Sequence, residues 1–75
     1  MALLTTIAQN LHQIRLRKNF SQRAVAEKAG LSVSYVSMLE RGQRSPPLET
    51  LDVLARALGV APLRLLEPAP SRSRR

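Results

Sequence analysis

The sequence has no cysteine and no tryptophan, and it contains only one phenylalanine and one tyrosine. Without cysteine, a chain of 75 residues can form neither disulfides nor thiolate metal sites. With so few aromatic residues, its core must be built from Leu, Ile, Val and Ala. A core of this size is marginal, so we expect a single domain that gains stability by forming oligomers.

Acidic side chains are scarce too, since five Asp and Glu stand against twelve Lys and Arg, for a net charge of +7. An excess of cations is typical of nucleic-acid binders. The carboxylates are scattered, and no Ser has a His or Cys partner that would indicate a catalytic triad, so we expect neither enzymatic activity nor a cofactor. His12 is the sole histidine, and with no Cys beside it we expect no metal site.

Long apolar runs are absent as well. Met1 to Leu4 is apolar, but it is too short and not basic enough for a secretory signal. No other stretch approaches the length of a membrane span. We therefore expect a cytoplasmic protein that has no membrane partner.

What the sequence does contain is a short pattern that occurs twice between residues 20 and 42. The two copies are Phe20-Ser21 with Val25 and Leu31-Ser32 with Val36. Each Ser suits the N-cap of a helix, and each apolar pair suits a hydrophobic staple. Between the copies, Gly30 can adopt a positive φ and end the first helix. Two short helices joined by such a turn form a helix-turn-helix.

The second helix of this motif has two unlike faces. At about 100° per residue, five side chains share an arc of roughly 140°, namely Val33, Ser34, Ser37, Met38 and Arg41. Val36 and Leu39 lie on the far side and are expected to enter the core. The free face carries small, polar or unbranched side chains, which can enter a major groove and contact base edges. An amphipathic surface helix that binds nothing is the alternative.

The stretch from Ser21 to Gly42, followed by Leu48 to Val60, resembles the phage repressor and Cro (XRE-like) type of helix-turn-helix domain. The resemblance covers about residues 7 to 66 and rests on Gln22, Ala26, Gly30, Val36 and Leu39, closed by Glu40-Arg41-Gly42. It implies a compact all-α fold of five helices, with the helix-turn-helix formed by the second and third. The function implied is a sequence-specific transcriptional regulator that binds double-stranded DNA. Small restriction-modification controllers and phage-type repressors are similar in size, and the sequence does not choose between them.

The remaining helices are expected around this motif. Thr6 and Gln9 match a capping box, which predicts a first helix from Ile7 to Lys18. Pro47 is expected in the first turn of a fourth helix that ends at Gly59. The apolar stripe of that helix is Leu48, Leu51, Leu54, Ala55 and Leu58. A short fifth helix is expected around Leu63 to Glu67. Residues 1–67 should form the DNA-binding domain, and residues 68–75 a disordered basic tail.

The angular argument and the resemblance together predict which residues contact DNA. The residues predicted to read bases are Val33, Ser34, Ser37 and Met38. The residues predicted to bind phosphates are Gln22, Arg23, Ser32, Tyr35, Arg41 and Arg44. The resemblance also implies an ion pair between Arg15 and Glu40, which would tie the first helix to the end of the recognition helix.

Apolar side chains crowd near the C-terminus in a number that a single helical turn cannot direct inward. We expect them to form a homodimer interface drawn from Val60, Leu63, Leu65 and Leu66, and the sequence does not fix which of the three leucines faces the partner. The alternative is that the leucines cap the core of a monomer. Members of the family often pair through this end, so the resemblance implies a homodimer on a partly palindromic operator. Two alternatives remain open. One is an antitoxin-like subunit whose main partner is another protein, and the other is a helical domain that uses its basic surface on RNA.

Overall fold

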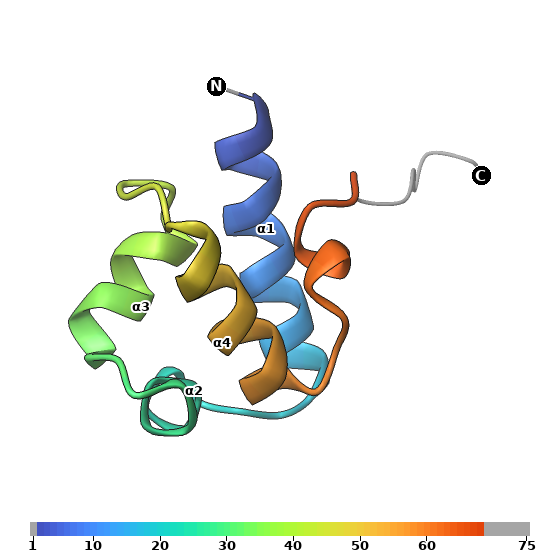
Figure 1. The fold of residues 1–75 in the computed structure, drawn as a ribbon. Coiled ribbons are helices and arrows are strands. Elements are labelled where there is room, and N and C mark those ends of the chain that lie inside the picture. The colour runs from blue at the N-terminus through green and yellow to red at the C-terminus, as the bar shows by residue number, and fades with distance from the viewer. Residues whose placement is uncertain (1, 69–75) are drawn as a thin grey trace.

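The computed structural model describes residues 2–68, which fold into four α-helices and one 3₁₀ helix (Figure 1). The elements are α1 (Ala2–Arg17), α2 (Gln22–Ala29), α3 (Val33–Glu40), α4 (Leu48–Leu58) and η1 (Pro62–Leu65). The all-α prediction is confirmed for this range. The prediction of a fifth α-helix is wrong, because the segment after α4 forms only a single 3₁₀ turn. The predicted tail from residue 69 onward lies outside the described residues.

The two helices of the predicted motif begin where their serines indicate. Ser21 Oγ accepts a hydrogen bond from the backbone N–H of Ala24 at 2.9 Å, and Ser32 Oγ accepts one from Tyr35 at 3.0 Å. Each hydroxyl therefore satisfies one of the N–H groups that the first turn of a helix leaves without a partner. The start of α2 and the start of α3 are confirmed.

All four α-helices end in the same way, with one residue in the left-handed region. These residues are Asn19, Gly30, Gly42 and Gly59. After α2, Gly30 has φ 72° and ψ 32°, and the N–H of Leu31 reaches back to the carbonyl of Ala26 at 2.8 Å. This is the Schellman arrangement, which satisfies carbonyls at the end of the helix and reverses the chain. Gly30 was predicted to end α2, and it does. Asn19 is the non-glycine member, and Asn tolerates this conformation better than most residues.

The first helix starts five residues earlier than predicted. Thr6 lies inside α1, which begins at Ala2, so the predicted capping box is wrong. Ala2, Leu3 and Leu4 are good helix formers and contain no breaker, which lets the helix extend toward the N-terminus. At α4 the boundary differs by one residue, since Pro47 is the N-cap and not part of the first turn.

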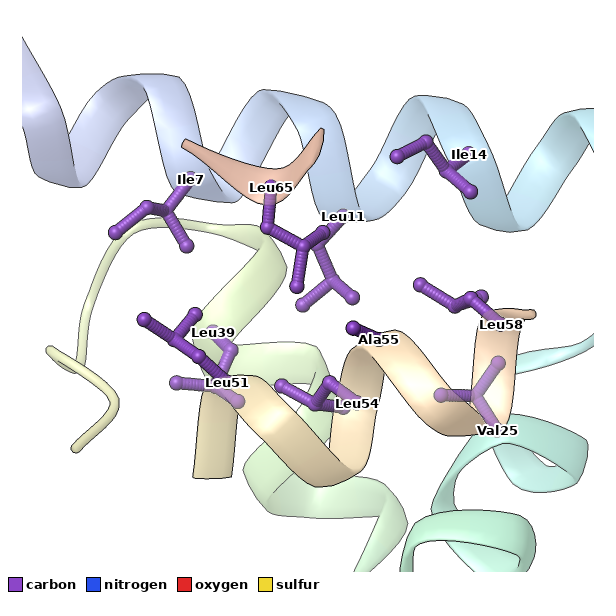
Figure 2. Packing of buried hydrophobic residues seen from close by; sticks show 10 residues of the cluster. All are labelled: Ile7, Leu11, Ile14, Val25, Leu39, Leu51, Leu54, Ala55, Leu58 and Leu65. Atoms are coloured by element: carbon purple, nitrogen blue, oxygen red, sulfur yellow. The ribbon is translucent and has the colours of Figure 1, made fainter. Parts of the chain in front are cut away.

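The core lies between α1 and α4, with α2 packed against α4 and α3 packed against α1 (Figures 1 and 2). Its ten clustered residues are Ile7, Leu11, Ile14, Val25, Leu39, Leu51, Leu54, Ala55, Leu58 and Leu65. In Figure 2 the side chains of α1 face those of α4, and Leu65 enters between them from η1. The aliphatic composition predicted for the core is therefore confirmed. Within residues 2–68, no helix is long and apolar enough to cross a membrane.

Two leucines depart from the predicted pattern in opposite directions. Leu48, assigned to the buried stripe of α4, is 80% exposed, because it is the first residue of the helix and projects beyond the core. Leu65, assigned to the dimer interface, is fully buried at 0% exposure, so this assignment is wrong. The tighter turn of a 3₁₀ helix aims Leu65 inward and leaves Leu63 outside.

A buried asparagine anchors η1 to α1. Asn10 is only 9% exposed, and its Nδ2 lies within hydrogen-bonding distance of the carbonyls of Arg64, Leu65 and Glu67, at 3.2, 3.0 and 2.6 Å. These carbonyls belong to the end of a short helix, where backbone acceptors lack partners within the helix. Asn10 therefore supplies long-range donors that hold the C-terminal turn, and with it Leu65, against α1.

Candidate nucleic-acid interface

The third helix is held to the rest of the domain along one side only. Val36 and Leu39 are buried, at 0% and 1% exposure, where α3 packs against α1 and α2. The opposite side of α3 faces away from the core at one edge of the molecule (Figure 1). The predicted division of this helix into a core face and a free face is therefore confirmed.

The free face carries the residues predicted to read bases. Val33, Ser34 and Arg41 are exposed, while Ser37 and Met38 are half-buried. Val33, Ser34 and Ser37 are small, whereas Met38 and Arg41 are longer and unbranched. The face carries two hydroxyls, two apolar side chains and one cation. It suits apolar contact with a thymine methyl group and permissive hydrogen bonding to base edges.

One border of this face is fixed by the carboxylate of Glu40, which ties three helices together. Arg15 of α1 donates to it twice, from Nε to Oε2 at 2.6 Å and from Nη2 to Oε1 at 3.0 Å. Gln22 of α2 donates from Nε2 to Oε1 at 3.1 Å, and His12 Nδ1 lies 2.9 Å from the same oxygen. The structure thus brings Arg15 and Glu40 together. It adds two partners, His12 and Gln22, that the sequence did not predict.

This carboxylate remains ionised although its side chain is only 4% exposed. Burial alone would raise the pKa of Glu40, because it penalises the charged form, but the hydrogen bonds from Arg15, His12 and Gln22 outweigh that effect. The pKa of Glu40 is therefore lowered from its ordinary value. An ionised carboxylate only accepts hydrogen bonds, so His12 Nδ1 carries the hydrogen in this contact. His12 is partly solvated, at 45% side-chain exposure, although it takes part in the network.

The other border of the free face is formed by Tyr35 and Arg44. Tyr35 is half-buried and packs against the core cluster. The guanidinium of Arg44 lies over its ring, with Cζ 5.7 Å from the ring centroid. This is within the range of a cation–π interaction. Arg44 belongs to the loop between α3 and α4, so the contact fastens that loop to the side of α3.

The residues predicted to bind phosphates are distributed around the same face. Arg23, Ser32, Arg41 and Arg44 are exposed, whereas Gln22 and Tyr35 are half-buried. Five of the six have a contact within the chain. Ser32 caps α3, Gln22 donates to Glu40, and Arg44 lies over the ring of Tyr35. Arg41 donates from Nη2 to Gln43 Oε1 at 3.3 Å, an exposed contact. Four side chains, three of them cationic, are thus presented to solvent around α3.

The sequence carried a partial signal for His12 and none for the other new contact. His12 and Arg15 are three residues apart on one helix and therefore share a face, which is where two groups can meet one carboxylate. The sequence predicts Gln22 only as a phosphate ligand. Within residues 2–68, no group of three His, Cys, Asp or Glu residues could hold a metal ion.

The four residues assigned to the dimer interface differ in how exposed they are in the structure. Leu63 is 69% exposed, and Val60 and Leu66 are partly buried where they pack against the core. Leu65 is excluded by its burial. The exposed apolar surface at this end of the chain is therefore smaller than predicted and is centred on Leu63.

Comparison with known proteins places this geometry in a family. Residues 11–65 match the helix-turn-helix family. The uncharacterised HTH-type transcriptional regulator y4dJ of Sinorhizobium fredii is 38% identical over 68 residues, which cover 91% of this chain and 88% of that protein. The control protein C.BamHI of Bacillus amyloliquefaciens is 42% identical over 60 residues, which cover 79% of this chain and 74% of that protein.

A solved structure agrees in fold as well as in sequence. The restriction-modification controller protein C.AhdI from Aeromonas hydrophila matches with a TM-score of 0.83 at 40% identity, over 87% of this chain and 98% of that one. The matched proteins are named as regulators or controllers, and none of the three is named as an enzyme. Sequence and fold together show that the chain belongs to the helix-turn-helix family of transcriptional regulators.

Proposed function

We propose that this helix-turn-helix regulator binds double-stranded DNA sequence-specifically, as a homodimer on a partly palindromic operator. In this proposal the free face of α3 enters the major groove, where Val33, Ser34, Ser37 and Met38 contact base edges. The observation that carries it is the position of α3. The helix is buried along Val36 and Leu39, and on the opposite face Val33 and Ser34 are exposed, so this surface is offered without any change of fold.

Positive charge around α3 supports contact with the DNA backbone. Arg23, Arg41 and Arg44 are exposed near the free face, and within residues 2–68 no carboxylate forms an ion pair with any of them. The domain also has an overall excess of cations, which favours binding to a polyanion. The start of α2 adds free backbone N–H groups and the positive end of a helix dipole.

Gln22 has a defined part in this scheme. Its Nε2 carries two hydrogens, and Glu40 accepts one of them. The second hydrogen remains for a phosphate oxygen. Glu40 would thus orient the amide at the start of α2 without using up its capacity to donate. Ser32 and Tyr35 complete the proposed phosphate set from the first turn of α3.

The proposed homodimer rests on the exposed apolar surface at η1. Leu63 is its centre, and the partly buried Val60 and Leu66 lie beside it in sequence. Pairing through this end would set two recognition helices one turn of DNA apart, about 34 Å. Sedimentation of the full chain at micromolar concentration tests this part. A dimer that Leu63→Glu converts to a folded monomer supports it, and a strict monomer that binds a single half-site contradicts it.

Binding to duplex DNA over a salt series tests the function as a whole. We expect wild-type affinity for a random-sequence duplex to fall steeply as salt rises, because phosphate contacts release counterions. Arg44→Ala should weaken binding to all sequences alike and flatten the salt slope by about one unit per contact. Arg56→Ala is the matched control, since it removes an equal charge that pairs with Asp52 on α4. Binding that is absent, or insensitive to salt, would favour a protein partner instead.

A further inference from the structure

Arg44 differs from the other partnered arginines in what holds it. Arg15, Arg56 and Arg64 each pair with a carboxylate. Arg44 has no carboxylate partner within residues 2–68, and its guanidinium rests instead on the ring of Tyr35. An aromatic face attracts the cation but does not neutralise it. The charge of Arg44 is therefore held in place and still available to an anion.

We propose that Tyr35 is a positioning residue for DNA binding, whose ring holds the guanidinium of Arg44 beside the free face of α3 before DNA arrives. The proposal rests on the function proposed above and adds a mechanism to one of its phosphate contacts. In that function Tyr35 and Arg44 are separate ligands of the backbone. Here the ring of the first acts through the side chain of the second.

Hydrogen bonds fix the backbone on both sides of the contact. Tyr35 is in the first turn of α3, where its N–H is bound by the cap residue Ser32, and its ring packs against the core cluster. After α3, the N–H of Gly42 bonds the carbonyl of Leu39 at 3.1 Å, and the N–H of Gln43 bonds that of Met38 at 2.9 Å. These two bonds form a Schellman turn, with Gly42 at φ 71°. The turn fixes the direction in which the chain leaves α3 toward Arg44.

What remains free between these fixed points is the long side chain of Arg44. An arginine that must be ordered when DNA binds loses rotamer freedom at that moment, which weakens binding. Contact with the ring restricts the side chain beforehand. The guanidinium of Arg44 also pairs with no carboxylate within residues 2–68, so its N–H groups stay open to phosphate. The cation–π attraction between a guanidinium and a ring at an exposed site corresponds to about a twofold to fivefold change in an equilibrium constant.

The two borders of the recognition face are thus organised by different chemistry. On one side, hydrogen bonds to the buried carboxylate of Glu40 fix Gln22. On the other side, the ring of Tyr35 fixes Arg44. Each arrangement leaves N–H donors that no carboxylate uses within residues 2–68.

The test is a cycle of variants that separates the ring of Tyr35 from its hydroxyl. Tyr35→Phe removes the hydroxyl and keeps the ring, whereas Tyr35→Leu removes the ring and keeps an apolar side chain. Both are made in the wild-type and in the Arg44→Ala background. Affinity for a random-sequence duplex is measured by fluorescence anisotropy over a potassium chloride series. Circular dichroism melts of each variant check that the fold is retained.

We expect the step from Tyr35→Phe to Tyr35→Leu to weaken binding about twofold to fivefold when Arg44 is present. In the Arg44→Ala background the same step should leave affinity unchanged. Tyr35→Trp should bind at least as tightly as Tyr35→Phe, because both lack the hydroxyl and indole is the best partner for a cation. Arg41→Ala is the matched control. The loss of Arg41 should weaken binding but leave the difference in affinity between Tyr35→Phe and Tyr35→Leu unchanged.

Two outcomes would overturn the proposal while leaving the function intact. An equal difference in affinity between Tyr35→Phe and Tyr35→Leu in the wild-type and Arg44→Ala backgrounds would mean that Tyr35 contacts DNA or supports α3 by itself. Tighter binding by Tyr35→Leu would mean that the ring holds Arg44 away from the phosphate. Failure of the function looks different, since the wild-type chain would then show no salt-dependent binding to any duplex.

Discussion

Removal of Arg15 while Glu40 stays in place should be one of the most destabilising single changes in this domain. Arg15→Met takes away the Nε and Nη2 bonds to the carboxylate, at 2.6 and 3.0 Å, and the Nη1 bond to the carbonyl of Phe20, at 2.9 Å. It leaves a carboxylate that is 4% exposed with only His12 and Gln22 as donors. Breaking a buried ion pair from one side costs about 3–5 kcal/mol.

We place the loss at about 3 kcal/mol, the low end of that range, because two donors remain and His12 is partly solvated. A chain of 75 residues has a total stability of about 4–11 kcal/mol. The variant should therefore lose a large share of its stability. Urea unfolding followed by circular dichroism gives the difference directly, with Arg56→Met as the control at an exposed pair that contributes about 1 kcal/mol or less.

The double variant Arg15→Met, Glu40→Met decides whether the reasoning is right. With both charges gone, no carboxylate remains buried without its main partner, so the double variant should be more stable than Arg15→Met alone. A loss below about 1 kcal/mol for Arg15→Met would contradict the account, because that is the size of a surface ion pair. A double variant less stable than the single one would contradict it too.

Three further predictions follow from burial, ionisation and capping. The pKa of Glu40 is lowered in the folded state. The stability that Glu40 contributes is therefore complete above the ordinary pKa of 4.5 and is lost as the pH falls through the lower folded pKa. Urea titrations should show a loss of stability below about pH 4.5 that is reduced in Glu40→Gln. Leu65→Ala should lower the free energy of unfolding by about 3 kcal/mol because the side chain is fully buried. Leu63→Ala should change the stability of the monomeric fold by about 0.5 kcal/mol or less. Thermal melts compare the two. Ser32→Ala should cost about 1 kcal/mol by removing the cap of α3, and hydrogen exchange should localise the loss to the first turn of that helix.

Short-range signals predicted the centre of this fold correctly. The N-caps Ser21 and Ser32 and the turn at Gly30 depend on residues within a few positions of one another, so a pattern in the sequence reports them directly. The same holds for the two faces of α3, whose phase is defined over two turns by the buried Val36 and Leu39.

The errors arose where no local pattern decides the outcome. Thr6 matches a capping box, but the apolar residues before it continue the helix, and a local match cannot tell a cap from a mid-helix Thr. The segment at η1 is too short to define a phase, so the burial of Leu65 could not be predicted. That burial depends on Asn10, which is 55 positions away along the chain from the carbonyl it binds.

The candidate site shows the same limit. The pairing of Arg15 with Glu40 was implied by resemblance, but the approach of His12 to that carboxylate joins residues 28 positions apart. The contact between Tyr35 and Arg44 depends on how the chain turns at Gly42. Such contacts follow from tertiary packing, which periodicity does not encode.

The measurement that tests the central claim most directly is a selection of bound sequences from a random duplex library, made in parallel with the wild-type chain and with Ser34→Ala, Ser37→Ala. If the free face of α3 reads bases, the wild-type chain should recover a partly palindromic motif, and the double variant should relax or change the preference at defined positions while it stays folded. Recovery of the same motif with the same enrichment by both chains, or of no motif by the wild-type chain, would contradict the claim.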